Sequence, residues 1–239
     1  MPLSKATRLI HAISHHLNTF SHWLLPQSCF LCGDTSSKPV CMACLADLPY
    51  QVSACRRCGK DLKEIGICSQ CQKKPPPYTH VQAIFSYIYP LNKLIPAAKY
   101  NQNLAVLNLL GNLMAQHLTI EPCPDVLIPI PLHPKRLRQR GYNQSLELAK
   151  CITRHTGIMA NYTSCRRIKN TPPQASLKDA TQRQANIQGA FQVLWTKPHW
   201  QHIVLVDDVM TTGGTVQELT NEFLKAGIQR VDVWCCART

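Results

Sequence analysis

The sequence predicts an α/β protein with a mainly parallel sheet, preceded by a small cysteine-rich module. Apolar strand-like segments alternate with helical segments from residue 81 onward, a pattern typical of βαβ units. Before them, eight of the 13 cysteines form four C-x-x-C pairs. With 239 residues, 45% of them hydrophobic, the chain is long enough for one medium domain and one small one.

Residues 1–25 are expected to form an amphipathic helix. Its apolar residues recur at helical spacing, at Leu9, Ile13, Leu17, Phe20 and Leu24. We expect this helix to dock on the rest of the protein. Because its first residues are basic, the alternative is a surface helix that contacts a membrane peripherally or binds a partner. No signal peptide is visible, and no apolar run reaches the roughly 18 residues of a membrane span. The sequence therefore predicts a cytoplasmic protein without a transmembrane segment.

The four C-x-x-C pairs lie within residues 26–74, which are expected to form a double zinc ribbon. Two pairs together supply the four thiolates of a tetrahedral Zn²⁺ site. The pairs are Cys29 with Cys32, Cys41 with Cys44, Cys55 with Cys58, and Cys68 with Cys71. Sequential pairing gives two structural zinc ions, and a cross-braced pairing of the same ligands stays open. Disulfides are disfavoured without an export signal, and an iron–sulfur cluster is a minor alternative. The other five cysteines are expected to be buried free thiols.

A proline run, Pro75–Pro77, is expected to link the cysteine module to a domain over residues 78–239. Strands are predicted at 81–89, 125–130, 203–206 and 231–236, and helices at 104–118, 146–156 and 216–226. A turn is predicted at 90–96, and residues 166–191 lack periodicity. An irregular segment of that length inside a compact domain is typical of a functional lid.

One stretch carries the clearest chemistry. The buried strand Ile203–Val206 is followed by two acids, Asp207 and Asp208, and then by a loop that leads into a helix. Carboxylates only accept hydrogen bonds, which suits paired ribose hydroxyls. The loop and the helix start offer hydroxyl and backbone N–H groups to a phosphate. The residues of this phosphate loop are Met210, Thr211, Thr212, Gly213, Gly214 and Thr215. The alternative is an ordinary strand–turn–helix corner with a threonine cap.

The formal net charge of +13 favours polyanionic partners. Residues 133–169 hold nine basic residues against one acid, Glu147. A basic loop from 135 to 140 is the expected site for an anion, with further bases closing over it from the lid. These candidate anion ligands are Lys135, Arg136, Arg138, Arg140, Arg166, Arg167 and Lys169. A solvated basic surface is the alternative for any one of them.

The stretch from Ile203 to Thr215 resembles the phosphoribosyl-pyrophosphate (PRPP) signature of type I phosphoribosyltransferases. Together with the cysteine pairs and the segments 130–136, 140–145 and 169–174, the chain resembles the ComF (ComFC-like) family. The resemblance implies a type I phosphoribosyltransferase fold. In it Asp207 and Asp208 hold the ribose of PRPP, residues 210–215 hold its 5′-phosphate, and Mg²⁺ is carried mainly by PRPP oxygens. It also implies a role in natural competence, with handling of single-stranded DNA in the cytoplasm and DNA-uptake proteins as partners.

The sequence does not identify a second substrate. It contains no recognisable hood over an acceptor, and no general base stands out; Glu147 lies within a predicted helix. Two hypotheses therefore stay open. The domain either binds PRPP as a ligand while the protein acts on DNA, or it is an active phosphoribosyltransferase with an unidentified base or amine acceptor. A purely structural adaptor in an uptake complex is a third hypothesis.

Overall fold

The computed structural model describes residues 27–100, 103–171, 187–194 and 200–239. The predicted helix at 1–25 and most of the predicted lid, residues 172–186, lie outside this range. The chain divides into two compact units, Met1–Leu48 and Pro49–Thr239, and each is described by itself. Among the described residues, none of the helices has the length and apolar character needed to cross a membrane.

The first unit is built around one group of cysteines. Its elements are β1 (Gln27–Ser28), β2 (Thr35–Ser36) and α2 (Met42–Ala46). Strands β1 and β2 pair antiparallel, and Cys29 and Val40 are its most buried side chains. With so little buried apolar surface, this unit fits the expectation of a fold that a metal stabilises.

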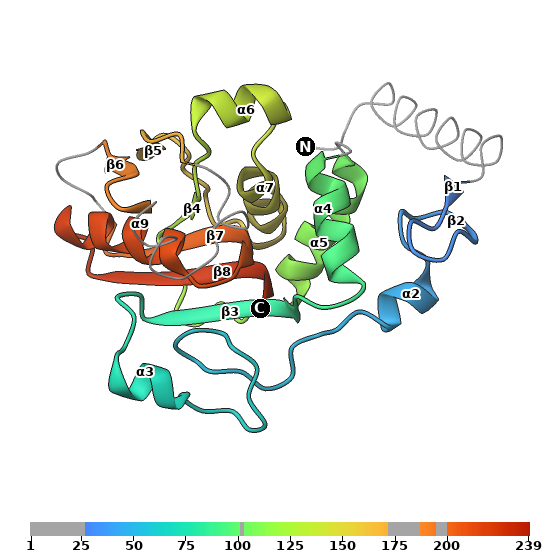
Figure 1. Ribbon diagram of the computed structural model, residues 1–239, viewed down its shortest axis with the longest axis horizontal. Helices are drawn as coiled ribbons and strands as arrows, with labels where there is room; N and C mark the ends of the chain where they lie inside the picture. The colour runs from blue at the N-terminus through green and yellow to red at the C-terminus, as the bar shows by residue number, and fades with distance from the viewer. Residues whose placement is uncertain (1–26, 101–102, 172–186, 195–199) are drawn as a thin grey trace, which may run out of the picture. The chain divides into compact units, whose positions relative to one another are not determined.

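The second unit contains a four-stranded sheet in the order β3-β8-β7-β4, in which every pairing is parallel (Figure 1). The expected α/β architecture with a parallel sheet is thereby confirmed. Its elements are α3 (Ser69–Lys73), β3 (His80–Ser86), α4 (Leu91–Tyr100), α5 (Leu104–His117), β4 (Val126–Pro129), α6 (Pro134–Arg140), α7 (Gln144–Thr156), β5 (Cys165–Arg167), β6 (Phe191–Val193), β7 (His202–Met210), α9 (Gly214–Lys225) and β8 (Arg230–Arg238). Strands β5 and β6 form a separate antiparallel pair.

The sheet is buried on both faces, which explains the continuous apolar runs in its strands. Side chains alternate along each strand, so Ile203 and Leu205 join one core cluster with Phe223 of α9. The residues between them, such as Val204 and Val206, are also fully buried and point to the opposite face. Helices α5 and α7 pack together beside that face and contact the sheet.

The structure differs from the sequence prediction at two helices. The predicted turn at 90–96 is instead the start of α4, with Pro96 inside the helix. Leu91, Leu94, Ile95 and Ala98 are all buried, so core packing outweighs the unfavourable effect of an interior proline.

The predicted basic loop at 135–140 is likewise helical, and forms α6. Its Pro134 stands at the first turn, and Gly141 ends it with a positive φ of 82°. The strand that carries the two acids is also longer than predicted: β7 continues through Asp207 and Asp208 to Met210.

The second cysteine-containing segment lies along the outer edge of β3, within the second unit. The N–H of Gln51 donates to the carbonyl of Ile84 at 2.9 Å, and the N–H of Val81 donates to the carbonyl of Arg56 at 3.1 Å. The side chain of Ser86 donates to Asp61 at 2.7 Å. The proline run at 75–77 therefore lies inside this compact unit.

Helices α5 and α7 meet at a glycine. A Cβ added to Gly111 would lie 2.8 Å from both Cβ and Sγ of Cys151. Replacing Gly111 with Val should therefore lower the free energy of unfolding by about 1–3 kcal/mol through overpacking. A matched control is Gly66→Val, because a Cβ at Gly66 meets nothing within 4 Å. Denaturant titration should show a change of less than about 0.5 kcal/mol in the control, and equal changes in both variants would contradict this packing.

Candidate functional site

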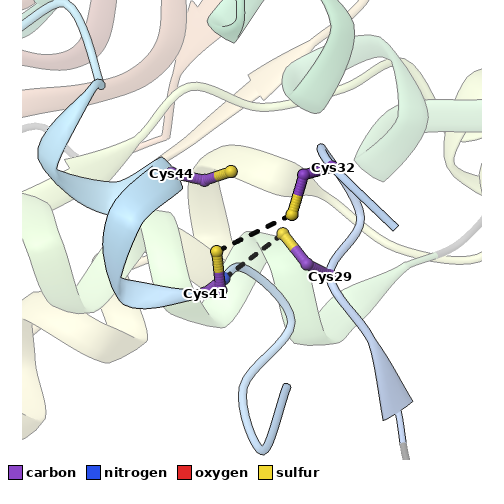
Figure 2. Close-up of side chains that lie close together, drawn as sticks. All are labelled: Cys29, Cys32, Cys41 and Cys44. Atoms are coloured by element: carbon purple, nitrogen blue, oxygen red, sulfur yellow. Dashed lines mark hydrogen bonds between the residues drawn. The ribbon is translucent and has the colours of Figure 1, made fainter. Parts of the chain in front are cut away.

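The eight paired cysteines form two groups, each made from consecutive pairs. Cys29, Cys32, Cys41 and Cys44 lie together in the first unit, as Figure 2 shows. The second group, in the second unit, comprises Cys55, Cys58, Cys68 and Cys71. Within each group all four sulfur atoms lie within 4.8 Å of one another. The structure therefore has the sequential pairing rather than the cross-braced one.

Both groups fit a structural zinc ion. A tetrahedral Zn²⁺ with Zn–S bonds of about 2.3 Å holds its sulfur atoms about 3.8 Å apart. The Sγ atoms of Cys32 and Cys41 are 3.8 Å apart, as are those of Cys58 and Cys68. In each group a backbone N–H also donates to a sulfur, from Cys41 to Cys29 in the first. Such donors stabilise thiolates, which are the form that binds metal.

The two groups also share their electrostatics. Burial raises the pKa of Cys29, but backbone N–H groups of Cys32 and Cys41 lower it by more, to about 6. The pKa of Cys55 falls to about 6 in the same way.

Of the five other cysteines, four are buried as predicted, but Cys123 is exposed. It lies between two prolines before β4, outside the core.

The two acids of the signature lie near the carboxyl end of β7, next to the loop that follows β4. Asp207 is half-buried and Asp208 is 9% exposed. The hydroxyl of Ser145, at the start of α7, donates to Asp207 at 3.2 Å. After β4 the chain returns through α7 to residues 159–161, which pair in parallel with Leu127 on the edge of β4 away from β7. Strand β7 instead continues through α9 to β8 on its other side, so the strand order reverses between β4 and β7. Ligands of parallel α/β sheets bind at such a reversal of strand order, outside the carboxyl ends of the strands.

Lys99 supplies the counter-charge to these acids. Its Nζ lies 2.7 Å from Oδ2 of Asp208, and the side chain is 22% exposed. Burial lowers the pKa of Lys99, but Asp208 raises it by more, so the side chain is held as an ammonium. Burial and the charge of Asp208 raise the pKa of Asp207 to about 7, although Lys99 opposes this rise.

The phosphate loop is a tight connection between β7 and α9. Gly213 precedes the helix with a φ of 79°, a conformation that favours glycine. A Cβ there would lie 2.8 Å from Cε of Met210 and 3.3 Å from the hydroxyl of Tyr78. The N-cap residue of α9 is this glycine, which has no side chain to cap the helix, and a helix N-terminus favours an anion.

Three of the predicted anion ligands gather close to the acids. The guanidinium groups of Arg136 and Arg167 both donate to Thr171, the former to its carbonyl at 2.8 Å. Burial and the charge of Arg136 lower the pKa of Arg167 to about 10, although Asp207 opposes this change, so all three charges interact. Arg140 interacts electrostatically with Lys99 and donates to Gln144 at 2.7 Å.

The other four predicted anion ligands are not drawn into this group. Arg166 donates to Gln192 on β6 at 3.0 and 2.7 Å. Lys169 donates to a backbone carbonyl at 2.8 Å. Lys135 and Arg138 are exposed on α6. The basic segment thus divides into three bases near the acids, of which Arg167 is buried and Arg136 and Arg140 are half-buried, and four exposed ones.

Two buried donors near the acids have no hydrogen-bond partner within the described residues. They are Nε2 of Gln144, which precedes Ser145, and Nε of Arg167. Buried polar groups are nearly always hydrogen-bonded in native proteins. Their position fits a site that a polar ligand completes.

Sequence reasoning missed Lys99 and Ser145. Ser145 stood in a segment used only for the family resemblance, and Lys99 stood next to a region predicted as a turn. The spacing of Leu91, Leu94, Ile95 and Ala98 indicates a helix, and that helix ends at Lys99. Glu147 is not drawn into the site, because it pairs with Lys150 at 2.8 Å on the same helix.

The ion pair yields a prediction about the acids. In Lys99→Met the pKa of Asp207 should rise further above 7, because an opposing positive charge is removed. Carboxyl-selective carbon NMR titration measures this value directly. Lys93→Met is the control, because Lys93 is an exposed lysine of the same helix. An Asp207 pKa that stays the same in Lys99→Met would show that the ion pair does not act on the acids.

Comparison with known proteins finds a matching domain family for the cysteine-rich part and relatives that match most of the chain. Residues 20–72 match the double zinc ribbon domain. The chain is 33% identical to the DNA utilization protein YhgH of Salmonella typhi over 225 residues, which cover 90% of this chain and 98% of the relative. It is 30% identical to competence protein F of Haemophilus influenzae, covering 83% and 88%. Competence protein ComFC of Bacillus subtilis is 24% identical, covering 83% and 89%.

Among solved structures, a glutamine PRPP amidotransferase from B. subtilis shares 17% identity with a TM-score of 0.37, over 55% of this chain and 27% of that one. A likeness of this size carries no weight for the fold or the function. The identities to YhgH and competence protein F extend over nearly the whole of both chains. The protein therefore belongs to the ComF family of competence proteins, together with YhgH.

Proposed function

We propose that the second unit binds PRPP, or a related phosphosugar, at the carboxyl ends of β4 and β7. The observation that carries this proposal is the joint arrangement of Asp207, Asp208 and the glycine turn at the start of α9, where the strand order reverses between β4 and β7. The two carboxylates suit ribose hydroxyls, and the Gly213 turn with the helix start suits the 5′-phosphate. Residues 210–215 form the whole of this phosphate subsite.

The basic residues near the acids suit the pyrophosphate part of the ligand. Arg136 and Arg167 converge on Thr171, and Arg167 keeps one buried donor without a partner among the described residues. A pyrophosphate near them would gain charge-assisted hydrogen bonds. Mg²⁺ takes oxygen ligands and usually arrives with the phosphates. Asp207 fits that ion best, because Asp208 already pairs with Lys99.

We further propose that the protein acts on single-stranded DNA during DNA uptake in the cytoplasm. The printed names of its relatives, a DNA utilization protein and two competence proteins, support this role. The net charge of +13 and the exposed bases Lys135 and Arg138 suit contacts to phosphates.

Whether PRPP is consumed is a separate question. An active transferase needs a group that activates the acceptor, and Glu147 is engaged with Lys150 instead. Binding without turnover is therefore the function that we propose first. A pyrophosphate-release screen with bases and amines, run with and without single-stranded DNA, distinguishes the two. Release that depends on one acceptor would establish the transferase.

The acid pair yields a prediction about ligand binding. PRPP affinity should rise as the pH increases through about 7, because Asp207 then becomes the charged acceptor. Calorimetric titration of wild-type protein and Asp207→Asn at several pH values measures this. The titration of the ligand itself is common to both proteins and cancels in the comparison.

In this experiment Asp207→Asn should bind PRPP more weakly than the wild-type protein at high pH. Its affinity should also lose the pH dependence that the titration of Asp207 causes. Identical pH profiles for the two proteins would remove Asp207 from the site. Asp208→Ala should abolish binding, and undiminished affinity in that variant would contradict the ribose assignment.

The exposed bases yield a prediction about DNA. Lys135→Gln/Arg138→Gln should weaken binding of a thymidine oligonucleotide. Its dependence on log salt should become flatter by about 0.7 for each DNA phosphate that the protein no longer neutralises. The control is Lys150→Gln/Lys225→Gln, because both lysines are exposed but already paired with glutamates. Fluorescence anisotropy at several salt concentrations measures both slopes. Equal slopes in the two double variants would exclude α6 as the contact surface.

A further inference from the structure

One buried side chain joins the second cysteine group to the phosphate loop. Arg238, at the end of β8, is only 3% exposed. Its Nε donates to the backbone carbonyl of Cys58 at 2.8 Å. Its Nη1 donates to the carbonyl of Met210 at 3.0 Å and also to that of Thr211. A single guanidinium therefore bonds a zinc-ligand residue on one side and the first two loop residues on the other.

We propose that Arg238 is a positioning residue through which zinc in the second cysteine group holds the phosphate loop in its binding conformation. Loss of zinc from that group then weakens phosphosugar binding, whereas loss of zinc from the first group does not. The ligand in this statement rests on the proposed function. The mechanical link between metal and loop does not.

The second group depends on its metal for its shape. Its buried cluster consists of Cys55, Cys58 and Cys71, with Leu62 and Cys68 packed against them. Four of these five residues are the ligands themselves, so little apolar surface remains without the ion. In such modules metal binding supplies the folding free energy. The carbonyl of Cys58 thus has a fixed position only while the four thiolates are bound.

Packing supports the same link. Gly59 follows Cys58 with a φ of 68°, and a Cβ there would lie 2.8 Å from Val81 and 3.7 Å from Cδ of Arg238. On the loop side, the buried Tyr78 lies against Gly213. Burial raises the pKa of Tyr78, and the charges of Arg238, Cys58 and Cys71 are close enough to act on it as well. The cysteine turn, Arg238 and the loop are therefore in continuous contact.

The first cysteine group provides an internal control. It has the same ligand number and sulfur spacing, but it belongs to the other compact unit. Cys44 and Cys71 hold equivalent places as the last ligands of their groups. Cys44→Ser and Cys71→Ser therefore remove the same chemical group from two similar metal sites.

The experiment uses the full-length protein and three measurements. Elemental analysis gives zinc per chain, calorimetry gives the affinity for PRPP, and hydrogen–deuterium exchange follows the peptide that contains residues 210–215. Cys71→Ser and Cys44→Ser should each lose one zinc ion. We expect PRPP affinity to fall at least tenfold and loop exchange to accelerate in Cys71→Ser, with both unchanged in Cys44→Ser.

Arg238→Gln tests the link without touching the metal. This variant should keep both zinc ions, yet show faster loop exchange and a PRPP affinity at least tenfold lower, because hydrogen bonds from a buried charged donor are removed. Arg230→Gln is the control, since Arg230 lies on the same strand and pairs with Asp232 instead. Because Arg238→Gln leaves the zinc ligands intact, it still tests the link if Cys71→Ser unfolds.

The outcomes separate the two proposals. Unchanged loop exchange in Arg238→Gln, or equal effects of Cys44→Ser and Cys71→Ser, would overturn the positioning role. A wild-type protein that binds no PRPP would contradict the proposed function alone. In that case the exchange measurements still decide whether zinc and Arg238 hold the loop.

Discussion

Two adjacent carboxylates near the end of a buried strand are the constraint around which the second unit is arranged. Burial and the charge of Asp208 both disfavour the charged form of Asp207 and raise its pKa. Positive charges and a hydrogen-bond donor from several elements stabilise the two carboxylates. Lys99 comes from α4, Ser145 from α7, and Arg167 from β5. The position of each of these elements is thus tied to one electrostatic requirement.

The same constraint explains the behaviour of the basic segment. The charge of Arg167 interacts with that of Asp207, and the charge of Arg140 interacts with that of Lys99. Arg136 lies beside Arg167, whereas the exposed Arg166 and Lys169 bind neutral oxygens elsewhere. A phosphosugar brings ribose hydroxyls to the acids and negative charge to the arginines, so it matches both halves of this arrangement. The exposed bases on α6 are then left for a second, extended anion. In our proposal one chain thus has two anion-binding sites, one beside the acids and one exposed on α6.

Local sequence signals predicted the parts of the site that lie in one contiguous stretch. The acids and the phosphate loop could be named because strand, turn and helix start follow one another within residues 203–215. The cysteine ligands could also be named, but not their pairing, since both arrangements use the same eight residues. The pairing follows from which turns lie together in space.

Other features depended on tertiary packing. Lys99 was missed because Pro96 suggested a turn, whereas burial of the apolar face of α4 keeps the helix intact. The helix α6 was missed for a different reason. Its signals, Pro134 at the start and Gly141 at the end, were present, but the run of charges between them was interpreted as a loop. Contacts across long sequence distances, such as Arg238 with Cys58, have no local signal.

The segment from Pro49 to Arg56, which lies along the edge of β3, limits where a truncated form of this protein can begin. It occupies donors and acceptors of β3 that would otherwise face solvent, at Val81, Ile84 and Ser86. An uncovered edge strand is a template for pairing with other chains. A truncated protein that begins at the proline run would expose this edge and would be prone to aggregate. One cut between Leu48 and Pro49 would keep the edge covered.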